Sequence, residues 1–174
     1  AGTFSNDENG ASECSVCPEG ISPAGASSCA TCPFGYQCTD GVADSTCSAG
    51  KNSNGETGGQ CEDCPIGYKC PGGTDHIACL PGSYSASTSQ SACTACEEGK
   101  FQSDNAKDTC SPCPEGHFCP ASSISPIQCG SVALYCPAES PIVNAATSGY
   151  YTTPTSAADE QRVGQLPCEA GFAC

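Results

Sequence analysis

Residues 29–38 read CATCPFGYQC, and residues 61–70 repeat the same pattern 32 positions later as CEDCPIGYKC. The step continues beyond each stretch, because Cys47 recurs as Cys79. A fixed period of this kind predicts tandem small modules rather than one large hydrophobic core.

The composition also argues against an ordinary globular core. The chain has 174 residues with 19 Cys, no Met, no Trp and only five Phe. This share of cysteine exceeds the level that marks a disulfide scaffold. So few large apolar side chains cannot bury enough area to offset the ordering entropy of the chain. Cross-links or bound metal must supply the remaining stability.

The local pattern favours turns and short strands. Gly and Pro, with 20 and 14 residues, interrupt every stretch that could form a helix, and no stretch shows sustained helical periodicity. We therefore predict a small disulfide-rich fold of tandem cysteine-rich modules, with short β-hairpins and turns and almost no helix. Modules that contact only their sequence neighbours form an elongated rod.

Structural zinc is the alternative to disulfides. Two Cys-x-x-Cys pairs in successive repeats would suit a four-thiolate site. Nearly half of the cysteines would lie outside such sites, however, and the chain has only two His. A metallothionein-like cluster fits less well, because tyrosines and turn residues fill the gaps. We therefore favour disulfides, which place the protein outside the cell or at the cell surface.

Sequential pairing accounts for most of the cysteines. If each cysteine that opens a Cys-x-x-Gly segment bonds to the next cysteine, four pairs form: Cys17–Cys29, Cys47–Cys61, Cys79–Cys93 and Cys96–Cys110. The second cysteine of each Cys-x-x-Cys then pairs six positions on, and a later pair has the same spacing: Cys32–Cys38, Cys64–Cys70, Cys113–Cys119 and Cys168–Cys174. Elimination leaves Cys129–Cys136. Spacing alone does not prove connectivity.

Cys14 is left without a partner. The chain opens with Ala-Gly-Thr-Phe-Ser, which matches the end of a Cys-x-x-Gly-x-aromatic-Ser segment such as residues 79–85. We therefore expect the chain to be a piece of a longer array, with Cys14 paired to an upstream cysteine. A reactive or intermolecular thiol is the alternative.

The cysteine spacing divides the chain into seven parts. We predict an incomplete leading repeat (1–28), two full repeats (29–60 and 61–92), a shortened repeat (93–109), a divergent repeat (110–136), a cysteine-free spacer rich in Ser, Thr and Pro (137–167), and the start of a further repeat (168–174).

The formal net charge of −14 excludes two classes of partner. Nucleic acid and anionic lipid surfaces would be repelled, because they bind basic patches. No apolar run approaches the length of a membrane span, so we expect no membrane insertion in this segment.

The aromatic side chains track the glycines. Nine of the eleven Phe and Tyr follow a Gly by one or two positions, as Tyr36 and Tyr68 do. A Gly permits a turn with positive φ, after which the ring can fold over the neighbouring disulfide. An aromatic surface that binds sugars is the alternative.

Catalytic residues are scarce. His117 stands where the repeats carry Tyr36 and Tyr68, which indicates a packing role, and His76 lies in a loop that we expect to be solvated. No nucleophile motif accompanies either histidine. We therefore predict that the chain is not an enzyme.

Cofactor sites are equally scarce. Clustered oxygen ligands at 6–10, 40–44 and 104–108 would suit calcium, but none follows an EF-hand loop. We expect solvated acidic turns at these positions and no cofactor, with calcium as the weaker alternative.

Glycosylation is expected on oxygen rather than nitrogen. No Asn lies in an Asn-x-Ser/Thr sequence, whereas Ser and Thr are plentiful and several lie close to proline, a composition typical of O-linked glycans. The candidate acceptors are Ser125, Ser140, Thr152, Thr153 and Thr155. Plain polar turns are the alternative at each position.

The motif Cys-x-x-Cys-Pro-x-Gly-Tyr-x-Cys at 29–38 and 61–70, with Cys-x-x-Gly-x-Tyr-Ser at 79–85, resembles the ephrin-receptor-like cysteine-rich repeat. That repeat belongs to the EGF-like and growth-factor-receptor cysteine-rich class. The resemblance covers about residues 1–129 and returns at 168–174. The departure after Cys119 leaves the local pairing open.

The resemblance implies an extracellular protein of the kind found in surface and mastigoneme-type glycoproteins of algae and other protists. We accordingly expect a structural module array of an extracellular filament, a flagellar-hair-like appendage or a cell-surface coat. Self-association and covalent O-glycans are the expected partners. The alternative is a ligand-binding ectodomain of a surface receptor or surface antigen.

Overall fold

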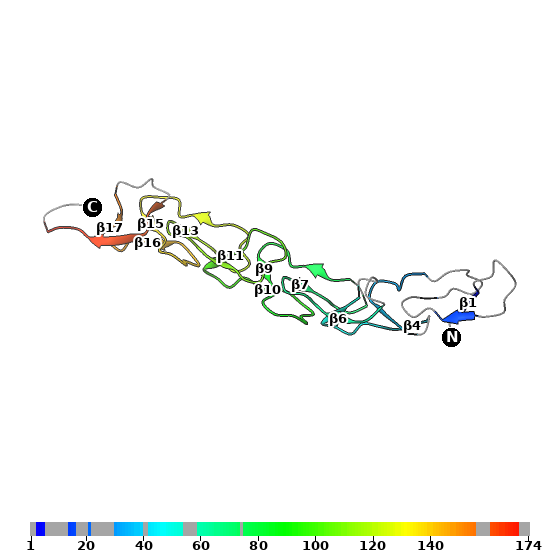
Figure 1. Ribbon diagram of the computed structural model, residues 1–174. Coiled ribbons are helices and arrows are strands. Elements are labelled where there is room, and N and C mark those ends of the chain that lie inside the picture. The colour runs from blue at the N-terminus through cyan, green and yellow to red at the C-terminus, as the bar shows by residue number, and fades with distance from the viewer. Residues whose placement is uncertain are drawn as a thin grey trace. The chain divides into compact units, whose positions relative to one another are not determined.

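A computed structural model describes residues 3–5, 14–16, 21, 30–39, 42–53, 59–73, 75–155 and 161–170 (Figure 1). These residues contain no α-helix and form nine two-stranded antiparallel sheets. The predicted small disulfide-rich fold of short hairpins and turns is thus confirmed. The elongated rod stays a prediction.

Each sheet is one hairpin, and the chain runs through the hairpins in order. The pairs are β1 (Thr3–Ser5) with β2 (Cys14–Val16), β3 (Tyr36–Thr39) with β4 (Val42–Thr46), β5 (Lys51–Asn52) with β6 (Glu62–Asp63), β7 (Tyr68–Lys69) with β8 (Ile77–Ala78), β9 (Ser83–Tyr84) with β10 (Thr94–Ala95), β11 (Lys100–Phe101) with β12 (Ser111–Pro112), β13 (His117–Phe118) with β14 (Ile127–Gln128), β15 (Leu134–Tyr135) with β16 (Asn144–Ala145), and β17 (Tyr150–Thr153) with β18 (Gly164–Pro167). The chain divides into two compact units, residues 1–78 with 87–93, and residues 79–86 with 94–174.

The structural repeat is half as long as the repeat in the sequence. A glycine with positive φ immediately precedes the first strand of most hairpins, and we call it the hairpin glycine. The hairpin glycines are Gly35, Gly50, Gly67, Gly82, Gly99, Gly116 and Gly149. Because Gly50 lies between Gly35 and Gly67, the 32-residue period contains two hairpins rather than one module.

Backbone hydrogen bonds join successive hairpins within each unit. In the second unit, the N–H of Gly99 donates to the carbonyl of Cys119 in the next hairpin (2.7 Å). Its own carbonyl accepts from the N–H of Cys113 (2.8 Å), which closes the hairpin. In the first unit Gly50 repeats both bonds, donating to Cys70 (2.8 Å) and accepting from Cys64 (2.9 Å). Gly35, Gly82 and Gly116 make bonds of the same two kinds, so each of these five glycines serves two hairpins at once.

Sulfur takes the place of a hydrocarbon core. The buried hydrophobic residues of the described ranges are all cysteines, namely Cys32, Cys38, Cys47, Cys64, Cys70, Cys79, Cys96, Cys113, Cys119, Cys129 and Cys136. The rings of Tyr68, Tyr84, Phe101 and Phe118 are half-buried, whereas those of Tyr36, Tyr150 and Tyr151 are exposed. The aromatic rings therefore border this core without forming it.

Six of the predicted cysteine pairs are disulfides in the structure. They are Cys32–Cys38, Cys47–Cys61, Cys64–Cys70, Cys96–Cys110, Cys113–Cys119 and Cys129–Cys136. Cys79, Cys93 and Cys168 are also disulfide-bonded. These cysteines cannot act as thiolate ligands of zinc. The pair Cys17–Cys29, the partner Cys174 and the side chain of Cys14 lie outside the described residues.

The bridges fall into two classes. A short bridge joins the cysteines three positions before and three positions after the hairpin glycine, as Cys113–Cys119 does around Gly116. A long bridge joins the cysteine three positions before the hairpin glycine to a cysteine immediately before the second strand of the same hairpin. Cys96–Cys110, around Gly99 and before β12, is an example. In the long-bridge hairpins of Gly50 and Gly99 the third position after the glycine is then a buried polar residue, Ser53 or Gln102.

These classes explain the irregular middle of the chain. Short and long bridges alternate around Gly35, Gly50 and Gly67, which produces the 32-residue period. Around Gly116 and the following Ala133, two short bridges come in succession. The shortened and divergent repeats that we predicted at 93–109 and 110–136 therefore keep their hairpins. They differ in the order of the bridge classes and, around Ala133, in a bridge that is one position longer.

The segment predicted as a spacer (137–167) also contains hairpin strands. It holds β16, β17 and β18, and β16 pairs with β15. The N–H of Ala146 donates to the carbonyl of Ala133 (2.8 Å), the bond that Cys113 makes to Gly99. Ala146 thus occupies a cysteine position. The segment lacks cysteine but continues the array.

The turns between paired strands carry a second positive-φ position. Ala106 adopts φ 56 there, and its N–H donates to the carbonyl of Cys79 (2.9 Å). The related turn of the first unit has Gly73 (φ 63), whose N–H donates to the carbonyl of Cys47 (2.9 Å). A residue with a Cβ is strained in this conformation and a glycine is not.

Ala106→Gly is therefore expected to stabilise its hairpin, by about 1 kcal/mol. The measurement is the free energy of unfolding from denaturant titration of the oxidised protein. Ala95→Gly in β10 serves as the matched control and should lower stability, because glycine weakens a strand. A loss of stability in Ala106→Gly would contradict the proposed strain.

Candidate functional site

The last described hairpin, β17 with β18, lacks the sulfur of the others. Three positions before Gly149 stands Ala146, and three positions after it stands Thr152, where short-bridge hairpins have two cysteines. Thr152 is buried, and its hydroxyl donates to the carbonyl of Val132. A hydrogen bond to the preceding hairpin therefore replaces the disulfide.

Arg162 holds the loop that follows β17. Its side chain is buried, and Nη1 donates to the carbonyls of Thr152 (3.2 Å) and Pro154 (2.6 Å), while Nη2 donates to that of Thr155 (3.4 Å). Nε has no hydrogen-bond partner. None of the ion pairs found within the described ranges involves Arg162. Its charge is thus matched there only by neutral carbonyl oxygens.

A pocket of about 550 Å³ lies beside this loop. We call it the tyrosine pocket. Its lining consists of Val132, Ala133, Ala146, Tyr150, Tyr151, Thr152, Thr155 and Arg162. The two tyrosines remain 41% and 36% exposed. None of these eight described residues is Asp, Glu, His or Cys, so they offer rings, a cation and hydroxyls to a ligand.

A second hollow of about 310 Å³ is lined by Glu115, His117, Pro154, Gln161 and Val163. His117 begins β13, at the position that Tyr68 holds in β7. Its Nδ1 lies 3.0 Å from the carbonyl oxygen of Glu115. The imidazole is half-buried and thus occupies the tyrosine slot, as predicted from the repeat.

His76 lies in a more enclosed position than the solvated loop that we expected. Its ring is half-buried and packs edge-on against that of Tyr68, with centroids 4.6 Å apart. Nδ1 lies 2.8 Å from Oδ1 of Asp75 and 3.4 Å from Nδ2 of Asn52. These contacts fix the histidine in the hairpin of β7 and β8.

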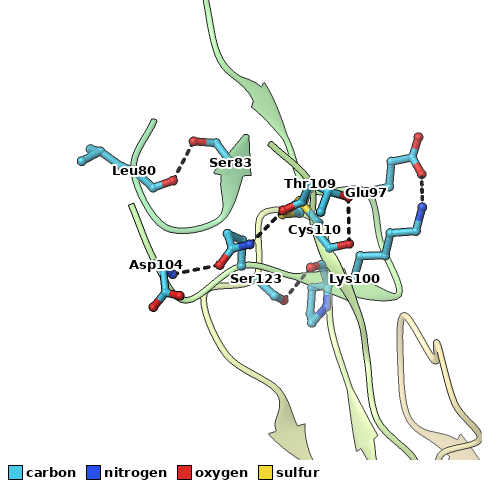
Figure 2. The surroundings of a disulfide bond; sticks show 11 residues. Leu80, Ser83, Glu97, Lys100, Asp104, Thr109, Cys110 and Ser123 are labelled. Atoms are coloured by element: carbon cyan, nitrogen blue, oxygen red, sulfur yellow. Dashed lines mark hydrogen bonds and ion pairs between the residues drawn. A yellow bond between two sulfur atoms is a disulfide. The ribbon is translucent and has the colours of Figure 1, made fainter. Parts of the chain in front are cut away.

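Figure 2 shows the surroundings of the Cys96–Cys110 bridge, where Lys100 and Glu97 form an ion pair of 3.2 Å. The buried amide of Gln102 is satisfied at both ends. Its Nε2 donates to the carbonyl of Thr109 (2.8 Å), and its Oε1 accepts from the N–H of Asp104 (3.0 Å). Gln102 can therefore stand where a short-bridge hairpin has cysteine.

The acidic cluster at 104–108, proposed for calcium, gains no further ligands from the described part of the chain. Asp104 pairs with Lys107 (3.3 Å), and no group of three His, Cys, Asp or Glu gathers within the described ranges. Residues 6–10 and Asp40 lie outside the described ranges.

The carboxylate of Asp63 in β6 faces Lys51 of the paired strand β5. Hydrogen bonds from Lys51 and Ser89, together with the charge of Lys51, hold the pKa of Asp63 below its usual value.

Two of the five candidate O-glycosylation sites require correction. Ser140 is 5% and Thr152 is 4% exposed, and both hydroxyls are hydrogen-bonded, that of Ser140 to the carbonyl of Pro137 (2.8 Å). A glycan cannot be attached there without opening the hairpins. Ser125 and Thr155 are exposed and Thr153 is half-buried, so these three stay candidates.

Comparison of the chain with models of known protein families and with curated proteins finds no match. In the described part of the chain, none of the elements is a helix with the length and apolarity needed to span a membrane.

Proposed function

We propose that the chain is a structural module array of an extracellular filament, appendage or surface coat, without catalytic activity. The contacts that repeat from hairpin to hairpin carry this proposal. The same two backbone bonds recur at Gly35 and Gly50 in the first unit and at Gly82, Gly99 and Gly116 in the second, and sulfur bridges fill the core. An array of this kind extends by adding hairpins and needs no central core.

Close contacts between hairpins that lie two steps apart along the chain also support a mechanical role. A Cβ placed on Gly82 would lie 2.5 Å from the carbonyl oxygen of Ser122, and one on Gly99 would lie 2.5 Å from that of Glu139. Each glycine thus touches a hairpin beyond its nearest neighbour. Bending one hairpin away would break contacts with two others, which suits a load-bearing element.

The disulfides indicate an oxidising, extracellular compartment. The finer assignment to a flagellar-hair-like appendage or glycoprotein coat is part of the proposal. Ser125 and Thr155 are the exposed positions that would carry O-glycans in it. Self-association of the glycosylated chain is the expected route to a filament.

Electron microscopy of the native full-length protein tests the proposal. We expect extended particles or fibres that persist in protease while the disulfides are oxidised and fragment after reduction. Compact, monodisperse particles that never associate would contradict the structural role.

A ligand-binding ectodomain is the second candidate, and exposed apolar side chains favour it. Phe34, Leu80, Ile124 and Ile142 are each at least 60% exposed. Such residues are common at protein interfaces when they gather in one patch. Capture of a soluble protein ligand by the monomer, without self-association, would favour this candidate over a filament.

A further inference from the structure

We propose that the tyrosine pocket binds an acidic saccharide unit, meaning a sugar ring that carries a carboxylate or a sulfate. This inference does not depend on the structural role proposed above. A module array could carry such a site whether it forms filaments or not.

The size and shape of the pocket suit a small ligand. Ligand sites typically enclose about 300–1,000 Å³, and this pocket has about 550 Å³. It opens where the array changes, because Ala133 replaces a hairpin glycine, and Ala146 and Thr152 replace two cysteines. Short-bridge hairpins such as that of Gly116 hold a disulfide at the positions that the last two occupy.

The charge of the lining selects an anion. The chain has 19 Asp and Glu and a net charge of −14, yet no Asp or Glu stands among the described residues that line this pocket. Arg162, the single arginine of the sequence, does. Its Nη2 makes a single bond, the long one of 3.4 Å to Thr155, and so keeps donor capacity, while its Nε–H is unpartnered but buried. Guanidinium groups pair strongly with carboxylate and with other oxyanions.

The tyrosines select a ligand with both an apolar and a hydroxylated side. Tyr150 and Tyr151 hold adjacent positions of β17, and both line the pocket while remaining partly exposed. An amphipathic ring of this kind packs against an apolar surface while its hydroxyl bonds to polar groups. A sugar ring offers C–H faces and hydroxyl edges together, which a bare inorganic anion does not.

The test is a binding titration of the oxidised protein, followed by NMR signals of the pocket residues. The probes are an oligogalacturonate, a neutral galactose oligosaccharide of equal length, and inorganic sulfate. We expect the acidic oligosaccharide to shift the signals of Tyr150 and Tyr151, with at least about tenfold weaker binding of the other two probes, the loss expected for one strong polar or ring contact. Salt should weaken the binding further.

Tyr150→Ala is expected to weaken oligogalacturonate binding about five- to tenfold through loss of the ring contact. Tyr36→Ala is the matched control, because Tyr36 follows a hairpin glycine in the same way and is 37% exposed, but lies outside the pocket. Arg162→Lys keeps the charge but loses the planar fork, and should lower the preference for the acidic probe. Its fold is checked by the disulfide pattern.

Four outcomes would overturn the proposal. The first is equal binding of acidic and neutral oligosaccharides, which would remove the role of Arg162. The second is sulfate binding as tight as that of the acidic sugar, which would indicate a bare anion site. The third is Tyr150→Ala binding like Tyr36→Ala, which would place any sugar elsewhere. The fourth is absence of binding by all three probes.

Discussion

Gly99→Ala is expected to lower the free energy of unfolding of the second unit by about 3 kcal/mol or more, for two separate reasons. Gly99 adopts φ 80, a conformation that costs a residue with a Cβ roughly 1–2 kcal/mol. In addition, the new Cβ would lie 2.5 Å from the carbonyl oxygen of Glu139, so two backbones must separate. Overpacking of this kind costs about 1–3 kcal/mol.

Gly149→Ala separates the two reasons. Gly149 has nearly the same conformation, φ 83, but a Cβ placed there meets nothing within 4 Å. This variant should lose only the roughly 1–2 kcal/mol of backbone strain. Denaturant titration gives both free energies, and hydrogen exchange at the amide of Glu139, which donates to Cys113, reports the local opening. Equal losses in the two variants would show that contact between alternate hairpins contributes nothing.

The cysteine spacing predicts bridges well because short bridges are local. Cys32–Cys38 and Cys64–Cys70 each span six positions, so few competing partners lie within reach. The same local rule holds for Cys129–Cys136, which spans seven positions. Pairing could thus be predicted even where the surrounding motif diverges.

The hairpin repeat was hidden because its two bridge classes look different in sequence. A short-bridge hairpin such as that of Gly67 has cysteines on both sides of the glycine, whereas that of Gly50 has Ser53 on one side. A comparison of the cysteine positions alone therefore gives a period of two hairpins instead of one. The spacing of glycines, with Gly82, Gly99 and Gly116 each 17 positions apart, is the signal that would have revealed it.

The site could be predicted less well than the fold, since its residues meet through strand register and loop closure. Tyr150 and Arg162 come together only because β17 pairs with β18 and the guanidinium bonds to the loop between them. The expectation for Ser140 failed for a related reason. Ser close to Pro is typical of O-glycosylated sequences, but in the turn from Pro137 the hydroxyl of Ser140 is an internal hydrogen-bond donor.

Cys113→Ala combined with Cys119→Thr is the second substitution with a large expected effect. It converts the β13–β14 hairpin to the residues that the β17–β18 hairpin carries naturally at Ala146 and Thr152. Loss of a bridge of this length should cost about 2 kcal/mol in the chain-entropy model. Both sulfurs are buried, so lost packing adds to the loss. Hydrogen exchange at Glu139 and Cys129, whose amides bond to Cys113 and Gly116, measures the local effect.

The reverse exchange provides the matched control. Ala146→Cys combined with Thr152→Cys places cysteines three positions before and after Gly149, the arrangement that forms a bridge around Gly116. A new disulfide should stabilise the last hairpin, but by less than the first variant loses, because engineered bridges strain their surroundings. The hydroxyl bond from Thr152 to Val132 is also given up. Free thiols at both positions in the oxidised protein would show that the two hairpins differ in backbone geometry. In that case the missing bridge would reflect a distinct hairpin rather than a substitution within the same one.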